Sequence, residues 1–106
     1  MPLDPVLVAD VKSWLSKAAN DLHAASVDIV AKPPLLEDAL FHTQQAVEKA
    51  FKAFLTFHDT PFRKTHNLEE LGAACLRIDP SLQNIVDDVV PLSEYAWLYR
   101  YPGPAE

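Results

Sequence analysis

The feature that most constrains the fold is an apolar segment between residues 40 and 57. On a helical wheel of about 100° per residue, its apolar side chains cover roughly 200°. They are Leu40, Ala46, Val47, Ala50, Phe51, Ala53, Phe54, Leu55 and Phe57. A helix that faces a single core needs an apolar stripe only somewhat wider than about 100°. We therefore expect this helix to be buried on two sides. One side should face its own chain, and the other a second helix pair or a second copy of the protein.

A separate amphipathic helix is predicted before it, from Pro5 to about Ala31. Asp4 supplies a capping oxygen, proline suits the first helical position, and Lys32-Pro33-Pro34 ends the helix. Its apolar stripe, with Trp14 beside it, is Val8, Val11, Leu15, Ala18, Leu22, Ala25 and Ile29. Four charged residues lie away from the centre of that stripe and are expected to face solvent: Asp10, Lys17, Asp21 and Asp28.

Further helix signals follow the apolar segment, whose own helix should run from about residue 35 to about residue 58. Asn67 is predicted to cap a third helix, with Glu70 at the position expected of a capping box. That helix should end at Asp79-Pro80, which also fits the start of a fourth helix. Pro91 removes a backbone donor, so we expect a kink or break within about two residues of Val90. The apolar stripes of these two helices are Leu68, Leu71, Cys75 and Ile78, then Leu82, Ile85, Val86 and Val89.

These elements predict an all-α protein, an antiparallel up-and-down bundle of four to five helices in a single domain over residues 1–106. The sequence has no alternating strand pattern of useful length. A content of 49% hydrophobic and 23% charged residues is typical of a globular chain, and the two glycines favour helices. Because the connections are short, neighbouring helices are expected to pack antiparallel.

Several classes of protein and site are disfavoured by what the sequence lacks. No apolar run approaches the roughly 20 residues of a membrane span, and the N-terminus has no signal-peptide pattern. We therefore expect a cytoplasmic protein without membrane contact. There is no glycine-rich phosphate loop, and His42, His58 and His66 are not spaced as zinc ligands, so we expect no metal and no cofactor. The single Cys75 lies on an apolar helix side and is expected to be an inert core thiol.

The net charge of −6 argues against a general affinity for nucleic acid but is compatible with a local basic cleft. Three polar groupings are candidates for such a cleft. In the first, Gln45, Lys49 and Lys52 stack along one side of the second helix, beside His42. This strip of donors suits an anion such as phosphate. The alternative is an ordinary solvated face with a Glu48–Lys52 pair.

The second grouping is the basic loop Arg63-Lys64-Thr65-His66, which leads into the third helix, where backbone N–H groups favour anions. The alternative is a solvated loop with a capping side chain. The third grouping places Arg100 among aromatic residues, namely Tyr95, Trp97, Tyr99 and Tyr101. Such an arginine can hold a phosphate while a ring stacks on a base. The alternative is core packing, with Arg100 interacting with a helix dipole.

Four segments occur in a recognisable order and cover nearly the whole chain. They are Trp14…Ala18…Asp21-Leu22…Ala25, Phe41…Gln44-Gln45-Ala46…Glu48-Lys49…Lys52, Thr65-His66-Asn67-Leu68…Leu71 and Arg100-Tyr101-Pro102. This combination resembles the HEPN family, the higher eukaryotes and prokaryotes nucleotide-binding domain. The resemblance implies an antiparallel helical bundle that forms a homodimer. It also implies a nucleotide or RNA ligand, or pairing with a minimal nucleotidyltransferase in a toxin–antitoxin system.

The resemblance leaves the question of catalysis open. Ribonuclease members of the family need no metal and carry an arginine followed about four to six residues later by a histidine. Arg100 is the matching arginine, but residues 101–106 contain no histidine, and His66 follows Arg63 too closely. The ribonuclease motif is therefore not met. Relatives usually continue past Arg100-Tyr101-Pro102 into another helix, so this chain is either a short form or lacks part of the natural protein.

Three hypotheses follow, and the missing histidine favours the first over the second. The first is a binding module for nucleotide or RNA phosphate, or for a nucleotidyltransferase partner. The second is a metal-independent ribonuclease that uses Arg100 and His66. The third is a structural dimerising module. For a functional site, we expect Arg100, His66 and the Lys49/Lys52 strip to converge on one cleft, with Tyr101 or Tyr99 stacking a base.

Overall fold

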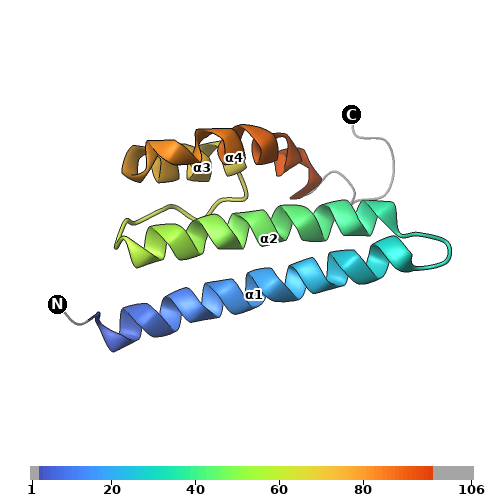
Figure 1. Cartoon of the computed structure of the whole chain (residues 1–106), viewed down its shortest axis with the longest axis horizontal. Coiled ribbons are helices and arrows are strands. Elements are labelled where there is room, and N and C mark those ends of the chain that lie inside the picture. Colours follow the sequence, from blue (N-terminus) through green and yellow to red (C-terminus); the bar gives the residue numbers. More distant parts are fainter. Residues whose placement is uncertain (1–2, 97–106) are drawn as a thin grey trace.

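Four α-helices make up most of the part of the chain that the computed structural model describes, residues 3–96. Helices α1 (Pro5–Val30) and α2 (Leu36–Phe57) form a long antiparallel hairpin, and α3 (Leu68–Ile78) and α4 (Gln83–Val89) lie on the other side of α2 (Figure 1). Two 3-10 helices, η1 (Pro80–Leu82) and η2 (Val90–Ala96), flank α4. No strand occurs within residues 3–96, and the expected all-α bundle is confirmed.

Helix α2 is the middle layer of the molecule. Helix α1 covers one of its sides, while α3 and η2 cover the other. The expected burial on two sides is therefore confirmed, and both sides are covered by the same chain. The wide apolar arc of α2 thus does not require a second copy of the protein, and the dimer remains a prediction that needs a different surface.

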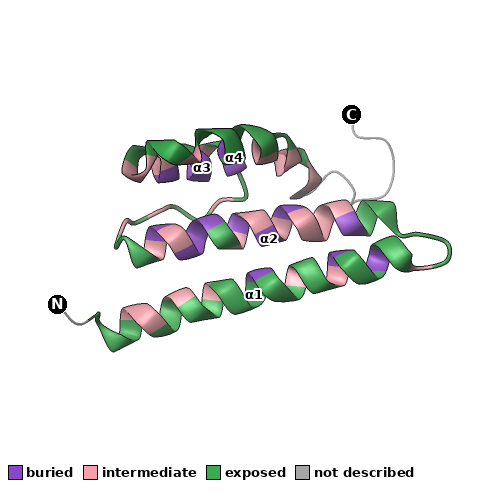
Figure 2. Ribbon diagram, in the orientation of Figure 1, coloured by how far each residue is buried: buried purple, intermediate pink, exposed green. Residues whose placement is uncertain are grey.

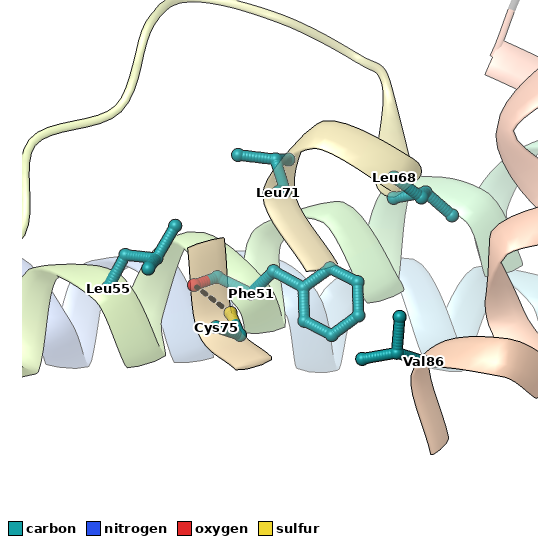
Figure 3. Close-up of a cluster of buried hydrophobic side chains, with 6 residues drawn as sticks. All are labelled: Phe51, Leu55, Leu68, Leu71, Cys75 and Val86. Carbon is teal, nitrogen blue, oxygen red and sulfur yellow. Dashed lines mark hydrogen bonds between the residues drawn. The ribbon is translucent and has the colours of Figure 1, made fainter. Parts of the chain in front are cut away.

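The apolar core lies between α2 and the α3–α4 layer (Figure 3). Its buried members are Phe51, Leu55, Leu68, Leu71, Cys75 and Val86. Full burial of a large apolar side chain contributes about 1.5–3 kcal/mol each, so this cluster is the main source of stability. The expectation for Cys75 is confirmed, because burial raises the pKa of its thiol to about 11 and keeps it protonated at neutral pH.

The helix ends follow local signals in the sequence. The Asp4 carboxylate accepts from the Val6 N–H at 2.8 Å, and the Asn67 side chain accepts from the N–H groups of Glu69 and Glu70. The capping-box expectation for Glu70 is wrong, because its carboxylate pairs with Arg63. The Asn67 N–H instead donates to the Thr65 hydroxyl, two residues earlier.

The expected break near Val90 is confirmed. The α-helical pattern of α4 ends at Val89, and the 3-10 helix η2 begins at Val90, one residue before Pro91. Proline lacks the N–H that an α-helix would use at that position. One neighbouring expectation is wrong, because Ile85 was assigned to the buried side of α4 and is exposed.

The inner face of α1 agrees with the expected stripe only in part, since Ala18 and Ala25 are buried as expected but the large side chains of that stripe are not (Figure 2). Its buried residues are Ala18, Ala25 and Asp28, whereas Leu15, Leu22 and Ile29 from the expected stripe are at least half exposed. Alanines let two helices approach closely, and this approach brings acidic residues of α1 against α2. Asp21 and Asp28 therefore face inward, and the expectation that they face solvent is wrong.

Gly72 marks a close approach of α3 to α4, because a Cβ atom there would lie 2.7 Å from Val86 Cγ1. Alanine is favoured over glycine in a helix by about 1 kcal/mol, but overpacking a core costs about 1–3 kcal/mol. We expect Gly72→Ala to lower the free energy of unfolding by on the order of 1 kcal/mol in urea denaturation. The double variant Gly72→Ala/Val86→Ala should show a smaller loss than the sum of the two single losses. A Gly72→Ala protein more stable than the parent would contradict this packing.

Candidate functional site

A buried carboxylate on α2, that of Glu48, is the centre of the first polar cluster. The residue is only 3% exposed. Its Oε2 atom accepts from Lys52 Nζ at 2.9 Å, and its Oε1 atom lies 2.7 Å from His66 Nδ1. Because Gln44, Glu48 and Lys52 follow one another at intervals of four, they lie along one line of the helix. The Glu48–Lys52 pair expected on a solvated face therefore exists, but it is buried.

The lysines expected to hold an anion are already paired. Lys52 is 6% exposed, and its ammonium lies 5.4 Å from the centre of the Trp14 ring and 5.8 Å from that of Phe62, where cation–π attraction adds to the Glu48 pair. Lys49 pairs with Asp21 of α1. The third member of the strip, Gln45, donates to the Gln44 side chain at 2.7 Å. These three residues do not form an open row of donors.

His66 combines a fixed ring with an accessible edge. Its side chain is 63% exposed, yet Nδ1 is bonded to Glu48, and Gln44 Nε2 donates to the His66 carbonyl at 3.1 Å. An ionised carboxylate only accepts hydrogen bonds, so Nδ1 carries the proton in this pair. In the neutral ring, Nε2 is then an acceptor directed away from Glu48. The structure thus connects His66 to Lys52 through Glu48, whereas Lys49 belongs to a different cluster.

His66 also lines a groove of about 490 Å³ between the start of α3 and η2. The lining residues are Thr65, His66, Asn67, Glu69, Val90, Ser93 and Glu94. The Ser93 hydroxyl accepts from the Leu68 N–H at 2.9 Å and ties the two walls together. The groove carries two carboxylates and one imidazole, so it offers proton-transfer groups rather than a concentration of positive charge.

The remaining predicted site residues stand apart from this groove or outside the described part of the chain. Arg63 forms a two-pronged ion pair with Glu70, which lowers the pKa of the Glu70 carboxyl mainly through the hydrogen bonds. Lys64 is exposed and does not line the groove. Arg100 and Tyr101, with Tyr99 and Trp97, lie outside residues 3–96.

A second polar cluster joins α1 to the first half of α2. Asp21 accepts from His42 Nδ1 at 2.9 Å and from Lys49, and His42 Nε2 lies 3.5 Å from Asp38 Oδ2. The pKa of Asp28 is raised, first by a hydrogen bond with the Asp38 carboxyl and then by burial. A bond between two carboxyl groups needs a proton on one of them, which is why the pKa rises.

Sequence reasoning named the Glu48–Lys52 pair but placed it on a solvated face, and it also placed Asp21 and Asp28 in solvent. The spacing of seven between Asp21 and Asp28 matches that between Ala18 and Ala25, so all four share one helix face. The i, i+4 series through Glu48 was equally visible, but a helical wheel does not show which face meets another helix. The spacing therefore indicated which residues share a face, but it did not indicate which helix that face would contact.

Comparison with known proteins identifies relatives of this chain. The family model described as the HEPN domain matches residues 11–106. A Methanocaldococcus jannaschii protein named "Putative toxin MJ1304" is 31% identical over 100 residues, which cover 88% of this chain and 64% of that protein. The chain thus spans 64% of the length of this curated relative. No solved structure matches the chain. None of the helices within residues 3–96 combines the length and apolar character needed to cross a membrane.

Proposed function

We propose a function on the basis that this chain belongs to the HEPN domain family. It is a toxin-type protein that binds RNA or nucleotide phosphate at the His66 groove. The toxin role is supported by the name of the M. jannaschii relative. The observation that carries the choice of site is the His66–Glu48 pair, in which an exposed imidazole is fixed by a buried carboxylate.

The Glu48 carboxylate contributes to the site by orienting His66 more than by stabilising the fold. A buried ion pair such as Glu48–Lys52 gives little net stability compared with apolar side chains of similar size. Its carboxylate does, however, hold the His66 ring in one orientation at the groove. A ring held in this way loses little freedom when it contacts a ligand, and fixed polar groups favour binding for that reason.

A second candidate is metal-independent cleavage of RNA, and the direction of His66 Nε2 favours it. As a general base, Nε2 would take the proton of a ribose 2′-hydroxyl. The 2′-oxygen would then bond to the neighbouring phosphorus to give a 2′,3′-cyclic phosphate, the bond from phosphorus to the 5′-oxygen would break, and that oxygen would take a proton from water. Arg100 is proposed to stabilise the phosphate charge in this reaction.

The test compares His66→Ala with His23→Ala, a change at an exposed histidine outside both clusters. In its protonated form the His66 ring can donate from Nε2 to a phosphate oxygen, and a hydrogen bond to a charged group contributes about 1.5–3 kcal/mol, so His66→Ala should weaken RNA or nucleotide binding by about 10- to 100-fold in fluorescence titrations. His23→Ala should bind like the parent. Arg100→Ala tests the proposed phosphate contact in the same assay.

Cleavage of labelled RNA by each protein separates the two candidates, with folding checked by circular dichroism. Loss of binding in His66→Ala, together with no cleavage by the parent, supports the binding role and removes the ribonuclease. Unchanged binding and cleavage in a folded His66→Ala protein would show that the site lies elsewhere.

We further propose that the protein forms a homodimer through α1 and pairs with a minimal nucleotidyltransferase. The dimer surface is supported by the outer stripe of α1, where Leu15, Leu22 and Ile29 recur every seven residues and are at least half exposed. A repeat of seven is the spacing at which two helices pack side by side. The nucleotidyltransferase partner is supported by the HEPN resemblance, and an adjacent reading frame for such an enzyme would strengthen it.

A further inference from the structure

A cluster between the end of α1 and the start of α2 has the donor atoms of a divalent metal site. One carboxylate oxygen of Asp28, one of Asp38 and one ring nitrogen of His42 all lie within 4.8 Å of one another. Asp38 and His42 are four residues apart on α2, so their side chains project from the same face of the helix. None of the three lines the His66 groove.

The buried side chain of Asp28 also points to a ligand. The residue is 7% exposed, and its Oδ2 atom has no hydrogen-bond partner among residues 3–96. A buried carboxylate without a partner is unfavourable, and proteins compensate such groups with an opposite charge or a metal ion. Both lysines of α2 are paired with other acids, Lys49 with Asp21 and Lys52 with Glu48. The cluster thus holds two acids and one imidazole, and a cation bound there would allow both acids to ionise.

The orientation of His42 fits metal coordination. Asp21 Oδ1 accepts from His42 Nδ1 at 2.9 Å, so Nε2 has its lone pair free on the side of Asp38. This arrangement of carboxylate, histidine and metal recurs in metalloproteins. His42 Nε2 and Asp38 Oδ2 are 3.5 Å apart. Ligand atoms bonded to tetrahedral zinc at about 2.0–2.2 Å are separated by about 3.4 Å, so this edge of the site needs little adjustment.

We propose that Asp28, Asp38 and His42 bind one divalent transition-metal ion of the zinc type, with Asp21 as the positioning residue for His42. One imidazole nitrogen and two carboxylate oxygens are donors that Zn²⁺ accepts. Two carboxylates balance the charge of the ion. The Asp38 side chain is 55% exposed and gives the ion a path from solvent. Three protein ligands leave further coordination positions open to water or a small ligand.

The test is calorimetric titration of the tag-free full chain with ZnCl₂ after treatment with a chelator. We expect one ion per chain. Asp28→Asn, Asp38→Asn and His42→Gln should each weaken binding at least about tenfold, and Asp21→Asn by about 10- to 100-fold, since it removes the group that orients the ligand. Matched controls are Asp88→Asn and His23→Gln, which change exposed residues outside the cluster and should bind zinc like the parent.

Two further measurements separate a lost site from a lost fold. Circular dichroism should show that each variant is helical, and zinc should raise the melting temperature of the parent and of Asp88→Asn but not that of Asp38→Asn. Co²⁺ bound to the parent should give visible absorption that His42→Gln alters. No zinc binding by the parent, or equal binding by the parent and the folded cluster variants, would overturn the proposal.

Discussion

Glu48→Ala is expected to lower the free energy of unfolding by about 3–5 kcal/mol, because it leaves the Lys52 ammonium buried without its carboxylate. Domains of this size are stable by only about 5–15 kcal/mol, so the variant should lose a large share of its stability. The cation–π contacts of Lys52 with Trp14 and Phe62 remain but do not neutralise its charge. Urea denaturation followed by circular dichroism measures the loss.

Two further variants test whether the unpaired charge of Lys52 causes this loss of stability. Asp88→Ala removes an exposed carboxylate and should change stability by less than about 0.5 kcal/mol. In Glu48→Leu/Lys52→Met both charges are replaced by apolar groups, and most of the lost stability should return. That double variant should still lack the function of His66, since nothing holds the ring. A Glu48→Ala protein as stable as the parent would show that Lys52 is not buried as described.

Light scattering at micromolar concentration is expected to give about twice the chain mass of 11.8 kDa, and Leu22→Asp is expected to give the monomer. Leu22 lies in the middle of the exposed α1 stripe and is 56% exposed in the single chain. Placing a carboxylate at the centre of an apolar interface should weaken association by on the order of 100-fold or more. Circular dichroism of the variant should remain that of a helical protein.

Ile85→Asp is the matched control, because Ile85 is also 56% exposed but lies on α4. It should leave the dimer intact. A parent protein that stays monomeric would rule the dimer out. A dimer that persists in Leu22→Asp and dissociates in Ile85→Asp would move the interface to the α4 side of the molecule.

The helix boundaries were accessible from the sequence because their causes are local. Asp4 and Asn67 each cap a helix through atoms two or three residues away, and Pro91 changes the pattern within one residue of its own position. The face of α1 that contacts α2 could not be predicted from such local signals. Its apolar stripe is wide enough to offer two faces, and the contact with α2 selects the face with alanines and aspartates over the one with Leu15 and Leu22.

The candidate site was only partly predictable for a related reason. His66 was selected by residue type and by its place before a helix, and the structure gives it a partner and a groove. Lys49 and Lys52 were selected as an anion-binding strip, with the local Glu48–Lys52 pair as the alternative, but the acid that pairs with Lys49 is set by packing. Asp21 is 28 residues from Lys49 along the chain, so no local rule links the two. Arg100 lies outside the described residues and stays a prediction.

The inner face of α1 has a consequence for how the molecule comes apart. Helix α1 is attached to α2 by alanine contacts, by the contact of Trp14 with Lys52 and by ion pairs such as Asp21–Lys49, while Leu15, Leu22 and Ile29 point away from the chain. The alanine contacts each contribute little apolar burial, and the part-buried Asp21–Lys49 pair is only weakly screened by salt. A partner helix on the outer stripe would add apolar burial that α1 lacks in the single chain and would hold the helix more firmly in place. The stability of the folded chain would then increase with protein concentration.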